Sequence, residues 1–183
     1  MEDSEVFAGK LLIAGPDLWD PNFRRTVVLI GHHDEEGAVG VVLNRATEVS
    51  VEEAAPPLAP IVEPEAPLFL GGPVQPSAAV VLADFEHPEV ARVIAFGSVG
   101  FLPEEAEPGD GDGVRRARVF AGHAGWGPGQ LEAELEEGSW IVEQATEDDV
   151  FTPEPDRLWE RVLRRKGRRF ALLRTMPVDP AAN

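Results

Sequence analysis

The chain has 183 residues, which is enough for one domain with its own hydrophobic core, and we expect a single domain over residues 1–183. It contains no cysteine, so a disulfide framework, a cysteine-based zinc site and a thiol nucleophile are excluded. Its net charge of −17 opposes binding to nucleic acids and to anionic membranes.

The charge is unevenly distributed along the chain. Residues 1–156 hold 8 Lys and Arg against 31 Asp and Glu, whereas residues 157–183 hold 8 against 2. The acidic start, Met1 to Glu5, is unlike the basic start of a signal peptide. The longest apolar runs are about seven residues, far short of the ~20 that a membrane-spanning helix needs. We therefore expect a cytoplasmic protein that does not bind membranes.

The first half of the chain predicts mostly strands. Short apolar runs predict strands at residues 9–14, 26–30, 38–43, 68–70, 78–82 and 91–96. The run Thr26 to Ile30 is continuous and β-branched, which is typical of a strand buried on both faces. A short helix is expected at residues 50–55, where Ser50 and Glu53 have the spacing of a capping box and Pro56 ends the helix.

The second half predicts strands at residues 118–121 and 140–142 and a last strand at 170–173. Helices are expected at residues 128–137, with Pro128 in the first turn, and at 155–166, where Leu158, Trp159, Val162 and Leu163 form an apolar stripe. Many strands with few crossover helices indicate an α+β fold with a mixed, mostly antiparallel sheet and about three helices.

A glycine-rich block from Gly122 to Glu134 is the strongest local signal. Four glycines between Gly122 and Gln130 indicate a backbone that bends sharply or approaches another segment closely. The spacing is G-x-G-x-G, so the dinucleotide fingerprint fails at Gln130, and Glu132 and Glu134 would repel a phosphate. Two interpretations remain: a tight strand-to-helix turn with Trp126 in the core, or a polar site read by Gln130 and Glu134.

Two further segments are candidates for a binding site. Gly71-Gly72-Pro73-Val74 either shapes the floor of a pocket or is a rigid turn. Asn44-Arg45 closes a predicted strand and either lines a site or forms a turn.

Reaction chemistry finds little support in the sequence. His32 and His33 would point to opposite faces of a strand, so they cannot share a metal ion. Ser98 lies in a window that lacks the glycine of a nucleophile elbow, because Phe96 occupies that place. We therefore assign no catalytic residue, no metal site and no cofactor.

The motifs together resemble the YqgE/AlgH family of small bacterial proteins. The matching stretches follow one another in order and are Gly9 to Ala14, Asp20 to Phe23 with Arg25 to Val28, Gly37 to Arg45, Gly71 to Val74, and Gly125 to Glu132 with Glu134. The resemblance implies one α+β domain whose sheet curls toward a barrel. Some members are named as transcriptional regulators on genetic grounds, and no established reaction or cofactor comes with the family. His123 departs from the commoner tyrosine at its place.

The working hypothesis is a non-enzymatic cytoplasmic binding or regulatory protein that affects transcription indirectly, with a small molecule or a protein as its unidentified partner. The candidate ligand-binding residues are Asn44, Arg45, Gly71, Gly72, Pro73, Val74, His123, Gly125, Trp126, Gly127, Gln130 and Glu134. A first alternative is a hydrolase that uses His123 and Glu134. A second is weak nucleic-acid binding through the basic C-terminal segment. The sequence leaves the oligomeric state open.

Overall fold

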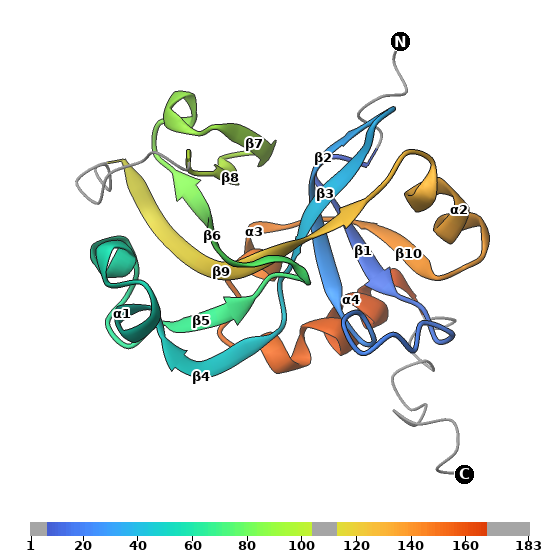
Figure 1. The fold of residues 1–183 in the computed structure, drawn as a ribbon, viewed down its shortest axis with the longest axis horizontal. Helices are drawn as coiled ribbons and strands as arrows, with labels where there is room; N and C mark the ends of the chain where they lie inside the picture. The colour runs from blue at the N-terminus through green and yellow to red at the C-terminus, as the bar shows by residue number, and fades with distance from the viewer. Residues whose placement is uncertain (1–6, 104–112, 168–183) are drawn as a thin grey trace.

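The computed structural model describes residues 7–103 and 113–167 of the chain (Figure 1). Its strands are β1 (Lys10–Ala14), β2 (Val27–Asp34), β3 (Gly37–Val42), β4 (Ala46–Ser50), β5 (Pro67–Leu70), β6 (Val74–Phe85), β7 (Val93–Phe96), β8 (Val99–Phe101), β9 (Val114–Trp126) and β10 (Trp140–Gln144). The α-helices of these ranges are α1 (Val51–Ala54), α2 (Gln130–Glu136), α3 (Glu147–Val150) and α4 (Leu158–Lys166). Short 3-10 helices lie at Pro56–Ile61, Pro88–Val90 and Pro155–Arg157.

All ten strands belong to one sheet, and β9 connects its two halves. The main path of the sheet is β10-β1-β2-β3-β9-β6-β8-β7, with β5 on β9 and β4 on β5. Residues 124–126 of β9 pair with β3, whereas residues 114–121 pair with β6. In Figure 1, β9 runs from the half that contains β4 to β8 into the half that contains β1, β2, β3 and β10. The two halves therefore share one continuous strand.

The sheet is mixed and mostly antiparallel, as the sequence predicts. Among the described strands, the pair β5–β9 is parallel and every other pair is antiparallel. The sheet curls so that β7 comes close to β2, but these two strands do not pair. The sheet therefore stays open, with β10 and β7 at the ends of its path.

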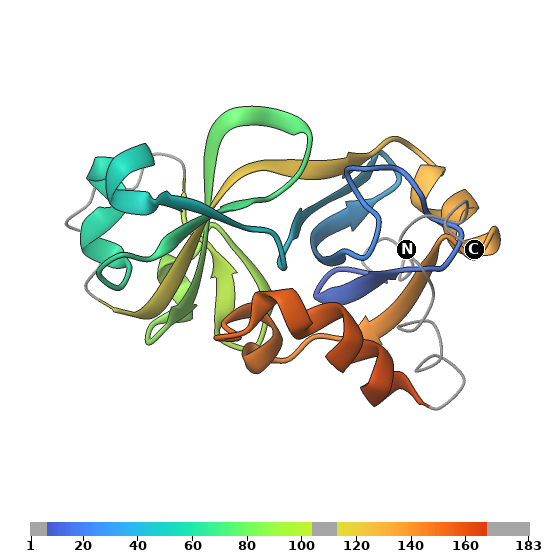
Figure 2. The same ribbon diagram turned by 90° about the horizontal axis from the view of Figure 1, so that it is seen from below.

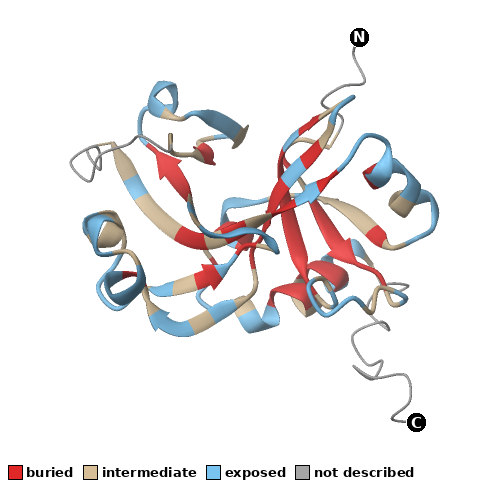
Figure 3. Cartoon of the chain, in the orientation of Figure 1, coloured by how far each residue is buried: buried red, intermediate tan, exposed pale blue. Residues whose placement is uncertain are grey.

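The core has layers on both faces of β1 and β2, which explains their continuous apolar sequences. Leu11 and Leu29 belong to one buried cluster, whereas their neighbours Leu12 and Val28 belong to another. Figure 2 shows α4 lying along one side of the sheet, and Figure 3 shows buried residues along β1 and β2 and on α4. The apolar stripe of α4 packs into the first cluster, as predicted from its sequence.

An ion pair, a capping box and an indole hydrogen bond hold α4 and the preceding helix α3 in place. Arg165 donates to both carboxylate oxygens of the buried Asp149, each at 2.9 Å. Thr146 and Asp149 form a capping box at the start of α3. The Trp159 indole N–H donates to the Ala14 carbonyl at 3.1 Å. Buried polar groups on both elements are thereby satisfied.

The predicted elements are confirmed in the described residues, with differences at their boundaries. The expected helix at 155–166 starts with a 3-10 turn, Pro155–Arg157, before α4. Pro128 precedes α2 instead of lying in its first turn, because Gly129 is the N-cap residue. The strands β4 and β8 and the helix α3 were not predicted. The predicted strand at 170–173 lies outside the described residues.

Candidate functional site

The glycine-rich block consists of the end of a strand, a short turn and the start of a helix. Residues up to Trp126 belong to β9, and α2 starts at Gln130. Gly122 has a φ of +73°, and a Cβ atom there would lie 2.5 Å from the Gly72 carbonyl oxygen. Only glycine permits this backbone conformation and this close approach together. The two predicted glycine-rich segments therefore lie side by side.

Glu134 accepts hydrogen bonds from two indole rings beside the turn between β9 and α2. Its Oε2 accepts hydrogen bonds from Trp126 Nε1 at 2.7 Å and from Trp140 Nε1 at 3.0 Å. Its Oε1 accepts from Gln130 Nε2 at 3.2 Å, and Gln130 Oε1 accepts from the Gly127 amide at 3.0 Å. Trp126 is only 6% exposed. Trp126 is therefore a core residue that holds a tight turn between strand and helix, which is the first of the two interpretations of this block.

Asn44 and Arg45 bind the loop between β1 and β2. Asn44 Oδ1 accepts from the Val27 amide at 3.0 Å, and its Nδ2 donates to the Arg25 carbonyl at 2.9 Å. Arg45 donates to the Pro21 carbonyl at 2.8 Å. Burial lowers the pKa of Arg45, and the charge of Arg24 adds to this shift. Both side chains use their polar atoms to fix a loop.

The Gly71 to Val74 segment is a turn packed against β9. The Gly71 amide donates to the Ala121 carbonyl at 2.9 Å. A Cβ atom at Gly72 would lie 2.2 Å from the His123 carbonyl oxygen, so this position also requires glycine for close approach. Val74 pairs with His123 across the strands and is partly exposed.

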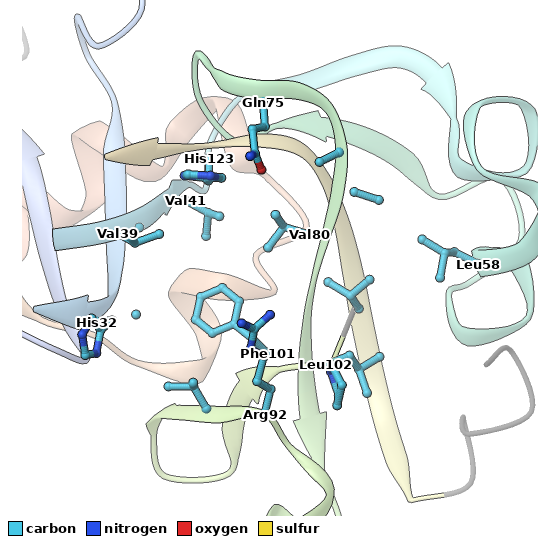
Figure 4. A pocket seen from close by; sticks show the side chains of 17 residues that line it. His32, Val39, Val41, Leu58, Gln75, Val80, Arg92, Phe101, Leu102 and His123 are labelled. Atoms are coloured by element: carbon cyan, nitrogen blue, oxygen red, sulfur yellow. The ribbon is translucent and has the colours of Figure 1, made fainter. Parts of the chain in front are cut away.

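A cleft of about 460 Å³ lies between the two halves of the sheet (Figure 4). It is lined from β2, β3, β6, β7, β8, β9, the 3-10 helix Pro56–Ile61 and connecting segments. The lining residues are Gly31, His32, Val39, Gly40, Val41, Leu58, Gln75, Ala78, Ala79, Val80, Val81, Arg92, Val93, Phe101, Leu102, Pro103 and His123. Of the predicted site residues, His123 alone lines this cleft. Asn44 and Arg45 instead hold the loop between β1 and β2, Gly71 to Val74 pack against β9, and Trp126, Gln130 and Glu134 lie at the turn between β9 and α2.

The cleft has apolar walls and a few polar side chains. Val39 on β3 is 44% exposed within it, although its neighbours on the strand are buried. In Figure 4, Gln75 and His123 lie toward one end of the cleft, and Arg92 lies toward the other. Sequence reasoning missed Val39 because an exposed valine in an all-apolar strand looks the same as a buried one.

His32 and His33 point to opposite faces of β2, as predicted. His32 is exposed at the cleft and its Nε2 lies 2.7 Å from Asp34 Oδ2, a contact that lowers the pKa of Asp34. His33 is buried, and its Nε2 lies 2.6 Å from Glu132 Oε1. The His32 ring therefore lies at the exposed cleft, whereas the His33 ring is buried beside α2.

The family follows from comparison with known proteins. A family model described as AlgH-like (DUF179) matches residues 11–171. The chain belongs to the AlgH-like family. The UPF0301 protein of Streptomyces coelicolor is 42% identical, and the match covers 100% of this chain and 98% of that protein. The UPF0301 protein of Chlorobaculum tepidum is 40% identical, with 96% and 95% covered.

Solved structures of AlgH-like proteins share the fold. The crystal structure of the protein DIP2367 from Corynebacterium diphtheriae matches with a TM-score of 0.84 and 32% identity, over 96% of this chain and 95% of that one. The solution structure of AlgH from Pseudomonas aeruginosa, a UPF0301 protein, matches with a TM-score of 0.70 and 28% identity, over 97% and 98%. The names of these relatives state no reaction, ligand or partner.

In this AlgH-like chain, His123 and Glu134 do not form a pair. His123 Nδ1 lies 3.4 Å from the Ala124 carbonyl oxygen, and no hydrogen bond between described residues joins it to Glu134. Both Glu134 oxygens already accept hydrogen bonds from Trp126, Trp140 and Gln130. The geometry therefore gives the hydrolase alternative no acid–base pair at these residues.

Three of the four basic side chains of α4 bind their own chain. Arg161 donates to Thr152 and to the Asp148 carbonyl, and Lys166 donates to the Val142 carbonyl at 2.8 Å. Arg165 pairs with Asp149. Three of the four basic side chains of α4 are thus engaged within the chain, and the rest of the predicted basic segment, from residue 168 on, lies outside the described residues.

Residues 7–103 and 113–167 contain no group of three or more His, Asp or Glu side chains placed to hold a metal ion. Within the same ranges, no helix has the length and hydropathy of a membrane span.

Proposed function

We propose that this AlgH-like protein is a non-enzymatic binding protein, and that the cleft between the sheet halves takes a small, mainly apolar molecule with one polar or anionic end. The observation that carries the proposal is the cleft itself. Its volume of about 460 Å³ lies within the roughly 300–1,000 Å³ of small-molecule sites. Val39 and Val93 stay exposed within it, so a ligand would remove apolar surface from water.

The residues around the apolar walls supply the polar chemistry of the proposed site. His32, Gln75, Arg92 and His123 line the same cleft from four different segments of the chain. An imidazole, an amide and a guanidinium are hydrogen-bond donors suited to a carboxylate or another polar end group. A small number of polar groups in an apolar pocket is the usual composition of a ligand site.

A small molecule suits this site better than a protein partner. A stable protein interface buries about 800 Å² on each side. The cleft is a concave space of ligand size, and its walls come from several strands. In this proposal the protein is cytoplasmic, which its cysteine-free sequence supports, and any effect on transcription is indirect because the chain carries a net charge of −17.

A charge placed on the wall of the cleft tests the proposal. Val39→Asp would put a carboxylate beside the bound apolar group, which we expect to weaken binding by about tenfold or more. The probes are the dye 1-anilinonaphthalene-8-sulfonate, followed by fluorescence, and decanoate, followed by displacement of the dye. Both probes have an apolar body and an anionic end.

The matched control is Val49→Asp on β4. Val49 is 43% exposed, almost the same as Val39, and does not line the cleft. Both variants add the same charge at the same degree of exposure. If Val39→Asp and Val49→Asp bind the dye and decanoate equally well, the cleft is not the binding site.

A further inference from the structure

A second cleft collects three arginines in a chain that is otherwise acidic. It has a volume of about 510 Å³ and shares no lining residue with the first cleft. Arg115, Arg116 and Arg118, all on β9, lie on its wall. Residues 1–156 hold only 8 Lys and Arg, so three in one cleft is a local concentration of positive charge.

Two of these arginines are neutralised by carboxylates. Arg115 lies 3.1 Å from Asp84 Oδ1. Arg116 lies 3.5 Å from Asp84 Oδ2 and 3.5 Å from Glu147 Oε2. These pairs account for the charges of Arg115 and Arg116.

Arg118 differs because its partners are uncharged. Its guanidinium donates to the carbonyl of Val150 at 3.0 Å and to the carbonyl of Thr152, and it lies over the Phe69 ring at 4.9 Å. Arg118 makes no ion pair with any carboxylate in the part of the chain that the structure describes. Burial lowers the pKa of Arg118 to about 10, with repulsion from Arg116 adding to the shift and Glu63 opposing it. Arg118 is therefore a half-buried cation that lines a cleft and has no carboxylate within ion-pair distance among the described residues, and Glu63 acts on it only from farther away.

We propose that this cleft binds a small organic molecule through an oxyanion group, a phosphate or a carboxylate, and that Arg118 is its principal contact. A guanidinium has five N–H donors, and the two carbonyl bonds leave three of them for a ligand. Phosphates and carboxylates accept from such a planar group through two parallel hydrogen bonds. This proposal is independent of the first cleft and of its ligand.

The rest of the cleft fits an apolar body attached to the anionic group. Its other walls include Pro60, Ile61, Val62 and Phe151. An organic phosphate or carboxylate would bury apolar surface there, which an inorganic ion cannot do. We therefore expect phenyl phosphate to bind more tightly than inorganic phosphate.

Glu63 lines the same cleft and acts against an anion. It is exposed, and its negative charge is the one that favours the charged form of Arg118. An incoming oxyanion would be repelled by Glu63 while it is attracted by Arg118. This arrangement predicts opposite effects for substitutions at the two positions.

The experiment is a calorimetric titration of the full chain with inorganic phosphate, phenyl phosphate and benzoate. We expect Arg118→Gln to weaken the binding of the preferred probe by tenfold or more. Arg164→Gln removes the same charge from an exposed position on α4 and should leave the binding unchanged. Tighter binding of phenyl phosphate than of benzoate would assign the site to phosphates, and the reverse order would assign it to carboxylates.

Glu63→Gln provides a second test that does not depend on the stability of the Arg118 variant. We expect it to tighten binding several-fold, and a gain of affinity cannot come from partial unfolding. The proposal is overturned if none of the three probes binds at millimolar concentration. It is also overturned if Glu63→Gln leaves the affinity unchanged, or if a folded Arg118→Gln variant binds as the unmodified protein does.

Discussion

At the scale of single residues, Glu134 is the group on which the end of β9 depends. One carboxylate oxygen accepts from two indole N–H groups, Trp126 at 2.7 Å and Trp140 at 3.0 Å. Glu134→Ala would leave both donors without a partner in a partly buried place. We expect a loss of about 2–4 kcal/mol in the free energy of unfolding, because each unsatisfied donor costs about 1–3 kcal/mol.

Urea unfolding followed by tryptophan fluorescence measures this loss. Glu136→Ala is the matched control, since Glu136 lies on the same helix and is exposed. Equal midpoints for the two alanine variants would show that the indole contacts do not stabilise the fold. Glu134→Gln should fall between them, because its amide oxygen still accepts a hydrogen bond.

The candidate site was predictable from the sequence only in part. The spacing of Gln130 and Glu134 predicted that they share a helix face, and they do hydrogen-bond to each other. The sequence left open whether Trp126 lies in the hydrophobic core or lines a binding pocket, because an aromatic side chain is common in both places. A ligand-binding role for this group stays a prediction. The first cleft was not predictable, since its walls come from strands that are distant in sequence.

At the scale of elements, Asp84 connects three strands of the sheet. This buried carboxylate on β6 accepts from Ser98, which precedes β8, at 2.6 Å, and pairs with Arg115 on β9. Burial by itself would raise the pKa of Asp84, but the hydrogen bonds from Ser98 and Arg115 outweigh it and hold the pKa below its ordinary value of 3.8. The carboxylate therefore stays ionised to a lower pH in the folded protein than in the unfolded chain.

The lowered pKa of Asp84 makes its contribution to the free energy of unfolding depend on pH. The contribution of Asp84 is fully present above its ordinary value of 3.8 and is lost as the pH falls through the lower folded value. We expect Asp84→Asn to cost about 1–3 kcal/mol at pH 7 and progressively less as the pH falls below 3.8. Denaturant titrations across this range measure the difference, and a cost that stays constant with pH would contradict the assignment.

Buried strands were easier to predict than exposed strands and helix caps. Continuous apolar runs gave β1, β2 and β3, because strands buried on both faces leave that pattern. The strand β4 was missed because its residues are polar or exposed and it pairs only with β5. Ser50 caps α1 at the predicted place, because its hydroxyl accepts from the Glu53 amide at 3.2 Å. A second cap, the capping box of Thr146 and Asp149, was not predicted because aspartate stands where the usual pattern has glutamate.

At the scale of the whole molecule, excess negative charge opposes folding. The chain carries a net charge of −17, so the compact state suffers self-repulsion at low ionic strength. Salt screens this repulsion, while the pair of Arg165 with the buried Asp149 is screened much less. We expect the Tm to rise by about 2–4 °C, equivalent to about 1 kcal/mol, between roughly 10 mM and 150 mM salt.

Differential scanning calorimetry with sodium chloride and with choline chloride measures this rise. The two salts should act alike, because screening depends on ionic strength and not on the cation. A Tm that falls with salt would mean that ion pairs, and not self-repulsion, dominate the electrostatic free energy.

The strand that both halves share has a consequence for how the molecule comes apart. Because β9 pairs with β3 through residues 124–126 and with β6 through residues 114–121, neither half can melt completely without losing a neighbour that the other half also needs. A one-residue slip of β9 would turn its side chains to the opposite face along its whole length. We therefore expect the two halves to unfold together as one cooperative unit.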